Sequence, residues 1–179
     1  MSLVNVYFSL GSNLGDREKN ITEALGRMDE AFGRHYEALS KLIETESMGF
    51  SGEKFLNAAV LYRIRPMDGG SAPLTNRSLS GAEGTGPERV LDIVKAIERS
   101  MGRTDRPEYD AEGERIYHSR VIDIDILFYG KEIIDTTTLT IPHKGISDRP
   151  FVMVPLLEIA RPSLKKAFPE YFKRNKQQA

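Results

Sequence analysis

The sequence predicts an α+β fold in which two helices pack on one face of a mostly antiparallel sheet. Apolar residues alternate in some segments, as in half-buried strands, and recur at spacings of three and four in others, as in amphipathic helices. These segments follow in the order strand, helix, strand, strand, helix, strand, and an extra hairpin strand and a helix come after them. That order is typical of a split βαβ arrangement. With 40% hydrophobic residues among 179, one such domain can bury a core of its own.

The first predicted elements are a strand and a helix joined by a glycine-rich turn. Alternating apolar residues predict a strand over residues 4–10. An apolar stripe at helical spacing then predicts a helix that begins after Asp16, a good N-cap residue, and ends near Gly33.

Two further strands and an insertion follow. A short strand is predicted at 40–45 and a longer one at 55–65, where Phe55 and Asn57 share one face. Residues 66–86 are rich in Gly, Ser, Thr and Pro and lack apolar periodicity, which predicts a mobile insertion within the domain.

The second half of the chain repeats the helix and strand pattern. A helix is predicted from residue 87 to residue 101, and a strong strand at 121–129 with a return strand at 132–134. A last helix is expected over 151–159. We therefore expect a single domain over residues 1–162, followed by a frayed C-terminal tail at 163–179.

Composition excludes several classes of protein. The chain has no Cys and three His, so a metal site would consist mostly of oxygen ligands, which favours magnesium over zinc. The net charge of −1 offers no footprint for a long nucleic acid. No apolar run approaches the roughly 18 residues that span a membrane. The N-terminus runs into the first strand without a basic leader, which predicts a cytoplasmic protein.

The most informative segment is the strand that contains Asp123 and Asp125. Residues two apart on a strand point to the same face, so these carboxylates are neighbours, while Ile122, Ile124, Ile126 and Phe128 form the opposite, apolar face. Two carboxylates about 7 Å apart repel by roughly 2 kcal/mol at an effective dielectric near 20. A divalent cation reverses that sign, which predicts a magnesium site. The alternative is a solvated strand with two surface aspartates.

Arginines surround this strand in the sequence. Arg103, Arg106, Arg115 and Arg120 lie in or beside the charged segment before it, and Arg149 lies in a later loop. Guanidinium groups bind polyphosphate oxygens in bidentate fashion, so these residues are candidate phosphate ligands. The alternative is a solvated loop in which acidic neighbours balance the arginines.

Other candidate residues carry weaker signals. The turn at 11–16 follows a strand and opens a helix, where free amides could hold an anion, although a plain strand-to-helix turn is the favoured interpretation. His143 could donate to a phosphate or bond a loop carbonyl. Asn57 beside Phe55 could recognise a flat heterocycle by amide pairing and stacking, or bond the local backbone.

Taken together, the motifs resemble those of the 6-hydroxymethyl-7,8-dihydropterin pyrophosphokinase family. The resemblance covers nearly the whole chain. It rests, in order, on LGSNLGD at 10–16, ETE at 44–46, FLNAAV at 55–60, RVIDIDILFYG at 120–130, LTIPH at 139–143, RPF at 149–151 and PLLEIA at 155–160.

The resemblance implies a ferredoxin-like α+β fold and an enzyme of folate biosynthesis. Such enzymes transfer the pyrophosphoryl group of ATP to the hydroxymethyl oxygen of the pterin and release AMP. By resemblance, two Mg²⁺ bind Asp123 and Asp125. The charged segment at 103–119 is expected to close over ATP and exclude water, because hydrolysis is the competing reaction. The catalytic residues are then Arg103, Arg120, Asp123 and Asp125, the ATP-binding residues Glu98, Arg103, Arg120, Ile126, Thr140, His143 and Arg149, and the pterin-binding residues Thr45, Met48, Phe55, Asn57, Tyr117 and Phe151.

The partners expected are ATP and the pterin, with no nucleic acid or membrane, and the chain is expected to be a monomer. Departures from the family pattern, such as Ser47 in place of a common Pro and His118 before the arginine, leave open a degenerate homologue that binds nucleotide without turnover. Two more functions stay open at this point: a different magnesium-dependent nucleotidyl or phosphoryl transferase, and a ferredoxin-like RNA-binding module.

Overall fold

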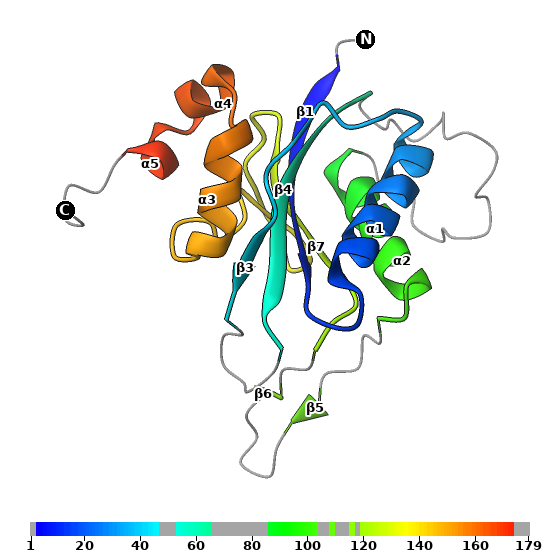
Figure 1. Cartoon of the computed structure of the whole chain (residues 1–179). Helices are drawn as coiled ribbons and strands as arrows, with labels where there is room; N and C mark the ends of the chain where they lie inside the picture. The colour runs from blue at the N-terminus through cyan, green and yellow to red at the C-terminus, as the bar shows by residue number, and fades with distance from the viewer. Residues whose placement is uncertain are drawn as a thin grey trace.

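A five-stranded antiparallel sheet forms the centre of the computed structural model (Figure 1). The structure describes residues 3–46, 53–65, 86–103 and 119–173, with the backbone of 108–109 and 115–116. Strand order is β2-β4-β1-β7, and β3 also pairs with β4. The strands are β1 (Val4–Ser12), β2 (Ala38–Leu39), β3 (Ile43–Thr45), β4 (Phe55–Ile64), β5 (Glu108–Tyr109), β6 (Arg115–Ile116), β7 (Asp123–Tyr129), β8 (Ile134–Asp135) and β9 (Thr140–Ile141).

Two helices, α1 (Arg17–Phe32) and α2 (Pro87–Ser100), cover one face of the sheet, as the sequence predicted (Figure 1). The Asp16 side chain caps α1 by accepting a hydrogen bond from the Lys19 amide at 3.0 Å. Gly33 ends α1 in the left-handed conformation, at φ 65°. The buried core between these helices and the sheet consists of Val6, Phe8, Leu10, Ile21, Ala24, Leu25, Met28, Leu56, Val60, Tyr62, Ile64, Val90, Val94, Ile97, Ile122, Ile124, Ile126, Tyr129, Leu139 and Ile141.

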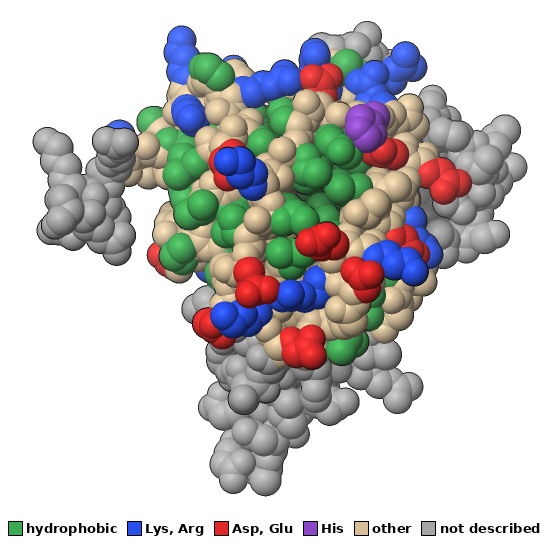
Figure 2. Space-filling view, in the orientation of Figure 1, with side chains coloured by type: hydrophobic (Ala, Val, Ile, Leu, Met, Phe, Trp, Pro, Cys, Tyr) green, Lys and Arg blue, Asp and Glu red, His purple; other side chains and the backbone are tan. Residues whose placement is uncertain are grey.

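The opposite face is partly covered too, by helices near the C-terminus (Figure 1). These are α3 (Pro150–Ile159), α4 (Pro162–Ala167) and α5 (Pro169–Phe172). Figure 2 shows hydrophobic side chains gathered over the region of α3 and β4, with charged side chains toward the margins. A second core lies beneath the three helices, formed by Tyr7, Ala59, Leu61, Leu127, Phe128, Ile146, Val152, Leu156, Ala160, Leu164 and Phe168.

The predicted frayed tail after Pro162 is wrong as far as residue 173. Each proline there occupies the first turn of a helix, where its missing amide costs nothing. The Phe168 ring packs against Phe128 at a centroid distance of 5.1 Å, so burial of aromatic surface holds this segment on the sheet.

The predicted position of Phe128 is also wrong, because β7 contains a bulge. Phe8 pairs with Ile126 and Tyr7 pairs with Phe128, so Leu127 is one extra residue in the ladder. The alternation therefore changes phase, and Phe128 lies in the second core instead of on the face that carries Ile124 and Ile126.

Two of the short strands differ from the prediction. The return strand expected at 132–134 is β8, which begins at Ile134 and pairs with β9, not with β7. Of the strand expected at 40–45, only residues 43–45 form a strand, β3, and the separate strand β2 ends just before that range, at Leu39. Between them the Ser40 hydroxyl accepts the hydrogen bond from the Ala59 amide at 2.9 Å.

The register of β4, β1 and β7 positions the site. Gly11 on β1 pairs with Asn57 on β4 and with Asp123 on β7, and Ser9 pairs with Asp125. These residues share the sheet face opposite α1 and α2. The insertion predicted at 66–86 lies outside the described residues except for Gly86, which precedes α2. No helix in the described part of the chain has the length and hydropathy to cross a membrane.

Candidate active site

Gly11 on β1 separates two groups of polar side chains on this face, one on β3 and β4 and the other around Asp123 on β7. The first group consists of Asn57, which is buried, and Thr45, whose hydroxyl accepts a hydrogen bond from Asn57 Nδ2 at 2.8 Å. A Cβ atom at Gly11 would lie 3.3 Å from Asn57 Oδ1 and 3.5 Å from Phe55 Cδ1. Glycine at this position therefore keeps the space beside Asn57 and the Phe55 ring open.

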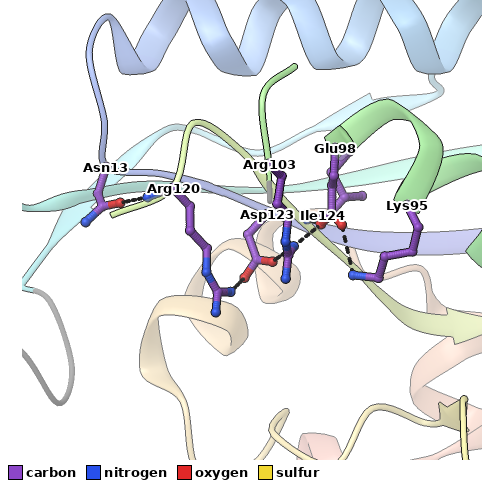
Figure 3. A network of polar contacts seen from close by, with 7 residues as sticks. All are labelled: Asn13, Lys95, Glu98, Arg103, Arg120, Asp123 and Ile124. Carbon is purple, nitrogen blue, oxygen red and sulfur yellow. Dashed lines mark hydrogen bonds and ion pairs between the residues drawn. The ribbon is translucent and has the colours of Figure 1, made fainter. Parts of the chain in front are cut away.

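The second group is centred on Asp123, which two arginines hold (Figure 3). Arg103 Nη1 lies 2.5 Å from Asp123 Oδ1, and Arg120 Nη1 lies 2.7 Å from Asp123 Oδ2. Burial opposes ionisation of this carboxyl, but the Arg120 and Arg103 guanidiniums outweigh burial and hold its pKa below the usual range. Asp123 is thus an anion at neutral pH.

Asp125, its neighbour on the same face, has no hydrogen bond or ion pair from the described residues. Burial raises the pKa of the Asp125 carboxyl, and the negative charge of Asp123 raises it further. His143, Lys95 and Arg149 act in the opposite direction, through charge alone. Within the described part of the chain, the site therefore contains one carboxylate with two partners beside a second carboxylate with none.

This pair has the chemistry that a magnesium ion requires. Mg²⁺ is commonly bound by one or two carboxylates together with substrate phosphates. Ionised Asp125 has no ion pair from the described residues, so its charge beside ionised Asp123 is unfavourable without a bound cation and favourable with one. No third carboxylate or histidine joins them in a metal-binding cluster among the described residues, so further ligands would come from substrate or water.

Glu98, which lies on α2, is fully buried behind Arg103. Its Oε1 accepts hydrogen bonds from Arg103 Nη1 at 2.6 Å and from the Ile124 amide at 2.7 Å, and its Oε2 accepts from Lys95 Nζ at 2.9 Å. Burial raises the pKa of Glu98, and the charges of Lys95 and Arg103 oppose that shift. The structure thus surrounds Glu98 with protein donors, whereas the family resemblance implied a nucleotide contact.

The turn after β1 holds Arg120 from the other side. Asn13 is fully buried, and its Oδ1 accepts a hydrogen bond from the Arg120 amide at 2.6 Å. The Asn13 backbone amide in turn donates to the Arg120 backbone carbonyl at 3.1 Å. Sequence analysis did not identify Asn13, whose partner lies 107 residues away. The turn at 11–16, considered as an anion site, uses this side chain to fix the backbone of an arginine.

The hairpin of β8 and β9 brings two more predicted residues close to Asp125. The His143 amide donates to the Leu127 carbonyl at 3.1 Å, which attaches the segment to β7. His143 Nδ1 accepts from the Gly145 amide at 3.1 Å, so a neutral ring carries its proton on Nε2. A Cβ atom at Gly145 would lie 2.8 Å from Arg149 Nε, so the absence of a side chain there makes room for Arg149.

The remaining predicted residues are less closely grouped. Thr140 donates to Asp135 Oδ1 at 3.3 Å within the hairpin. Phe151 on α3 is half-buried against the second core. Ile126 is buried in the core under α1 and α2, so its side chain does not share the face of the aspartates. Met48 and Tyr117 lie outside the described residues.

Lys95 is a further residue that sequence analysis missed. It lies one helical turn before Glu98, donates to it, and influences the pKa of both aspartates. The spacing of three residues was the available signal, but such pairs are common on exposed helix surfaces. Only the burial of Glu98 distinguishes this pair.

Comparison with known proteins yields consistent matches. A curated relative from Porphyromonas gingivalis, named 2-amino-4-hydroxy-6-hydroxymethyldihydropteridine pyrophosphokinase, is 36% identical over 87% of this chain and 90% of its own. One of the same name from Bacillus subtilis is 30% identical over 90% of this chain and 81% of its own. The mitochondrial folate synthesis bifunctional protein of Pisum sativum is 38% identical over 86% of this chain, which spans only 25% of that protein.

A solved structure and a sequence family agree with these relatives. A crystal structure of an HPPK-DHPS protein in complex with substrates matches 96% of this chain and 44% of its own, with a TM-score of 0.57 at 13% identity, which supports the fold. The sequence model of 7,8-dihydro-6-hydroxymethylpterin-pyrophosphokinase matches residues 7–67 and 60–161. The chain belongs to the 7,8-dihydro-6-hydroxymethylpterin-pyrophosphokinase family.

Proposed function

We propose that the chain transfers the pyrophosphoryl group of ATP to the hydroxymethyl oxygen of 6-hydroxymethyl-7,8-dihydropterin and releases AMP, as a step of folate biosynthesis. The observation that carries this proposal is the cross-strand row from Asn57 through Gly11 to Asp123. Neighbouring antiparallel strands lie about 4.8 Å apart, so the row spans about 10 Å from an amide suited to a heterocycle to a carboxylate suited to a phosphate-bound cation.

The pterin end of the row is the group on β3 and β4. Asn57 pairs with the edge of a flat ring through its amide, Thr45 fixes the orientation of that amide, and Phe55 supplies an aromatic face. Phe151 on α3 supplies a second apolar face. Met48 and Tyr117 complete this set by family resemblance.

The nucleotide end consists of arginines and the hairpin beside β7. Arg103 and Arg120 bind phosphate oxygens, and His143, through Nε2–H, and Arg149 approach the polyphosphate from the hairpin side. Thr140 belongs to the ATP site by family resemblance. The resemblance also implied Glu98 and Ile126, but both side chains are buried, and Glu98 bonds Arg103. The segment at 103–119, which the sequence analysis expected to close over ATP, lies mostly outside the described residues.

Two Mg²⁺ ions at Asp123 and Asp125, when bound with ATP, supply the positive charge that pyrophosphoryl transfer requires. The protein itself contributes mainly by positioning, because transfer from a polyphosphate depends on in-line alignment and charge neutralisation. Fixed arginines do both, since they retain their charge throughout the reaction.

The fold proposed for this function is ferredoxin-like. The order β2-β4-β1-β7, all antiparallel, with α1 and α2 on one face, corresponds to two interleaved βαβ units. Helices α3 to α5 are then an addition on the opposite face, and the pterin and nucleotide groups share the remainder of that face. We also propose that the chain acts as a monomer.

Nucleotide product analysis tests the function. The protein is mixed with ATP, Mg²⁺ and 6-hydroxymethyl-7,8-dihydropterin, with controls that omit the pterin or the metal. AMP should form only when all three are present. Asp123→Asn should abolish it, and Asp92→Asn, a change of an exposed aspartate on α2, should not. ADP or pyrophosphate as product would indicate another transferase, and ATP binding without any product would indicate a degenerate homologue.

A further inference from the structure

Five side chains of alternating charge run from α2 to the segment before β7 (Figure 3). They are, in order, Lys95, Glu98, Arg103, Asp123 and Arg120. Each contacts the next, at 2.9, 2.6, 2.5 and 2.7 Å. Lys95 is the outermost member and belongs to neither the proposed pterin group nor the proposed nucleotide group.

Glu98 is the fixed point of this chain of charges. It holds Arg103 twice, because the Glu98 carbonyl accepts from the Arg103 amide at 3.0 Å and Glu98 Oε1 accepts from Arg103 Nη1. The Ile124 amide on β7 donates to the same Oε1, which ties α2 to the strand that carries both aspartates. The orientation of this carboxylate therefore sets where the Arg103 guanidinium lies.

Lys95 completes the hydrogen bonding of that carboxylate. Glu98 is fully buried, and Lys95 Nζ donates to the oxygen that Ile124 does not use. A buried carboxylate that loses a donor must turn toward its remaining donors or draw in water. Either response moves the Arg103 guanidinium relative to Asp123.

We propose that Lys95 is a positioning residue, which acts through Glu98 to hold Arg103 where it meets the polyphosphate. This inference rests on the proposed function, since Arg103 must bind phosphate for its position to affect the reaction. Lys95 does not touch the substrate; its contribution depends entirely on Arg103. This dependence separates the proposal from direct binding of the nucleotide by the Lys95 ammonium, whose side chain is 31% exposed.

A double-mutant cycle tests this dependence. Lys95→Met should lower kcat on the order of 10-fold, because a small displacement of a positioned group is costly, while the KM for the pterin stays unchanged. In an Arg103→Ala background the same Lys95→Met change should alter kcat less than about 2-fold, because non-additivity marks residues that act as a unit. An equal loss in both backgrounds would overturn the proposal and indicate that Lys95 contacts the substrate itself.

Two further variants separate positioning from folding. Lys95→Arg retains a donor and should restore most of the activity, whereas Lys19→Met, a change of an exposed lysine on α1, should leave kcat unchanged. Loss of activity in Lys95→Arg equal to that in Lys95→Met would count against the proposal.

The affinity for a non-hydrolysable ATP analogue with Mg²⁺, measured by calorimetry on the same variants, provides a readout that does not require turnover. Affinities should show the same non-additivity. If the wild type binds the analogue but forms no AMP, the proposed reaction fails while this cycle still decides whether Lys95 acts through Arg103. Additive affinities would refute the role of Lys95 whether or not AMP forms.

Discussion

Replacing Asp125 by Asn should stabilise the protein while it removes activity. Burial and the charge of Asp123 raise the pKa of the Asp125 carboxyl, so its ionised form is less favourable in the folded chain than in the unfolded chain. Ionisation of such a carboxyl begins to lower the free energy of unfolding once the pH rises above its pKa in the unfolded chain, about 3.9. The full loss is present once the pH also exceeds its pKa in the folded chain. Asn has nearly the same shape without the charge.

The magnitude follows from the geometry of the strand. Two unit charges about 7 Å apart, the spacing of residues two positions apart on a strand, repel by about 2 kcal/mol at an effective dielectric near 20. Lys95, Arg149 and His143 offset part of this repulsion. We expect Asp125→Asn to raise the free energy of unfolding by about 1 kcal/mol at pH 7, which corresponds to about 2–4 °C in Tm for a chain of this size.

Asp123→Asn should have the opposite effect on stability. Arg120 and Arg103 outweigh burial and lower the pKa of Asp123, so its ionisation stabilises the fold above the unfolded pKa, and that contribution is lost as the pH falls through the folded pKa. Removing the charge leaves two guanidiniums without this partner, at a cost of about 1–2 kcal/mol after allowance for partial exposure. Both variants should lose more than about 100-fold in turnover, because either lacks a metal carboxylate.

Urea unfolding without Mg²⁺ at pH 7 and pH 3, together with AMP release at pH 7, measures these effects. The increase in the free energy of unfolding caused by Asp125→Asn should disappear at pH 3, where the wild-type carboxyl is protonated in both the folded and the unfolded chain. Adding Mg²⁺ and an ATP analogue should stabilise the wild type more than Asp125→Asn. The reasoning is refuted if Asp125→Asn lowers stability at pH 7, or if both variants shift it in the same direction.

Three further changes have distinct expected outcomes. Gly11→Ala should weaken pterin binding about 10-fold, because its Cβ meets Asn57 Oδ1 at 3.3 Å, with ATP-analogue affinity unchanged; calorimetry with each ligand would contradict this if both affinities fell equally. Phe168→Ala should lower the free energy of unfolding by about 3 kcal/mol through lost packing on Phe128, with turnover per folded molecule unchanged in urea-calibrated assays. Tyr62→Phe removes a hydroxyl that donates to Asp29 Oδ1 at 2.7 Å and should cost about 1 kcal/mol of stability; a change in kcat would show that this residue couples to the site.

The central sheet could be predicted from the sequence because its strands carry the signal locally. β4 alternates on two faces over its whole length, and Asp16 and Gly33 mark both ends of α1. The bulge in β7 could not be predicted, because it depends on how Leu127 fits against the partner strand. The last helices were missed because Pro162 and Pro169 indicate breaks in a sequence, although each begins a helix in the structure.

The same distinction holds at the site. Asp123 and Asp125 were identified because a spacing of two on a strand is enough to place them on one face. Asn13 and Lys95 were not, because their importance lies in contacts that the sequence does not reveal: one with a backbone distant in the chain, the other with a carboxylate whose burial depends on packing. Local sequence pattern thus predicted the paired carboxylates, and the structure adds the groups that hold the arginines beside them.

The contacts of Asn13 and Glu98 explain how arginines that bond Asp123 can also bind a substrate. In the structure both Arg103 and Arg120 form ion pairs with Asp123. A cation bound at the aspartates would compete with the arginines for the Asp123 carboxylate. A polyphosphate beside them would compete with Asp123 for the arginines. Asn13 holds the Arg120 backbone, and Glu98 holds Arg103, by contacts that do not involve Asp123. The arginines therefore remain in the site when their bonds to Asp123 break, and the entropy cost of ordering them has already been met during folding.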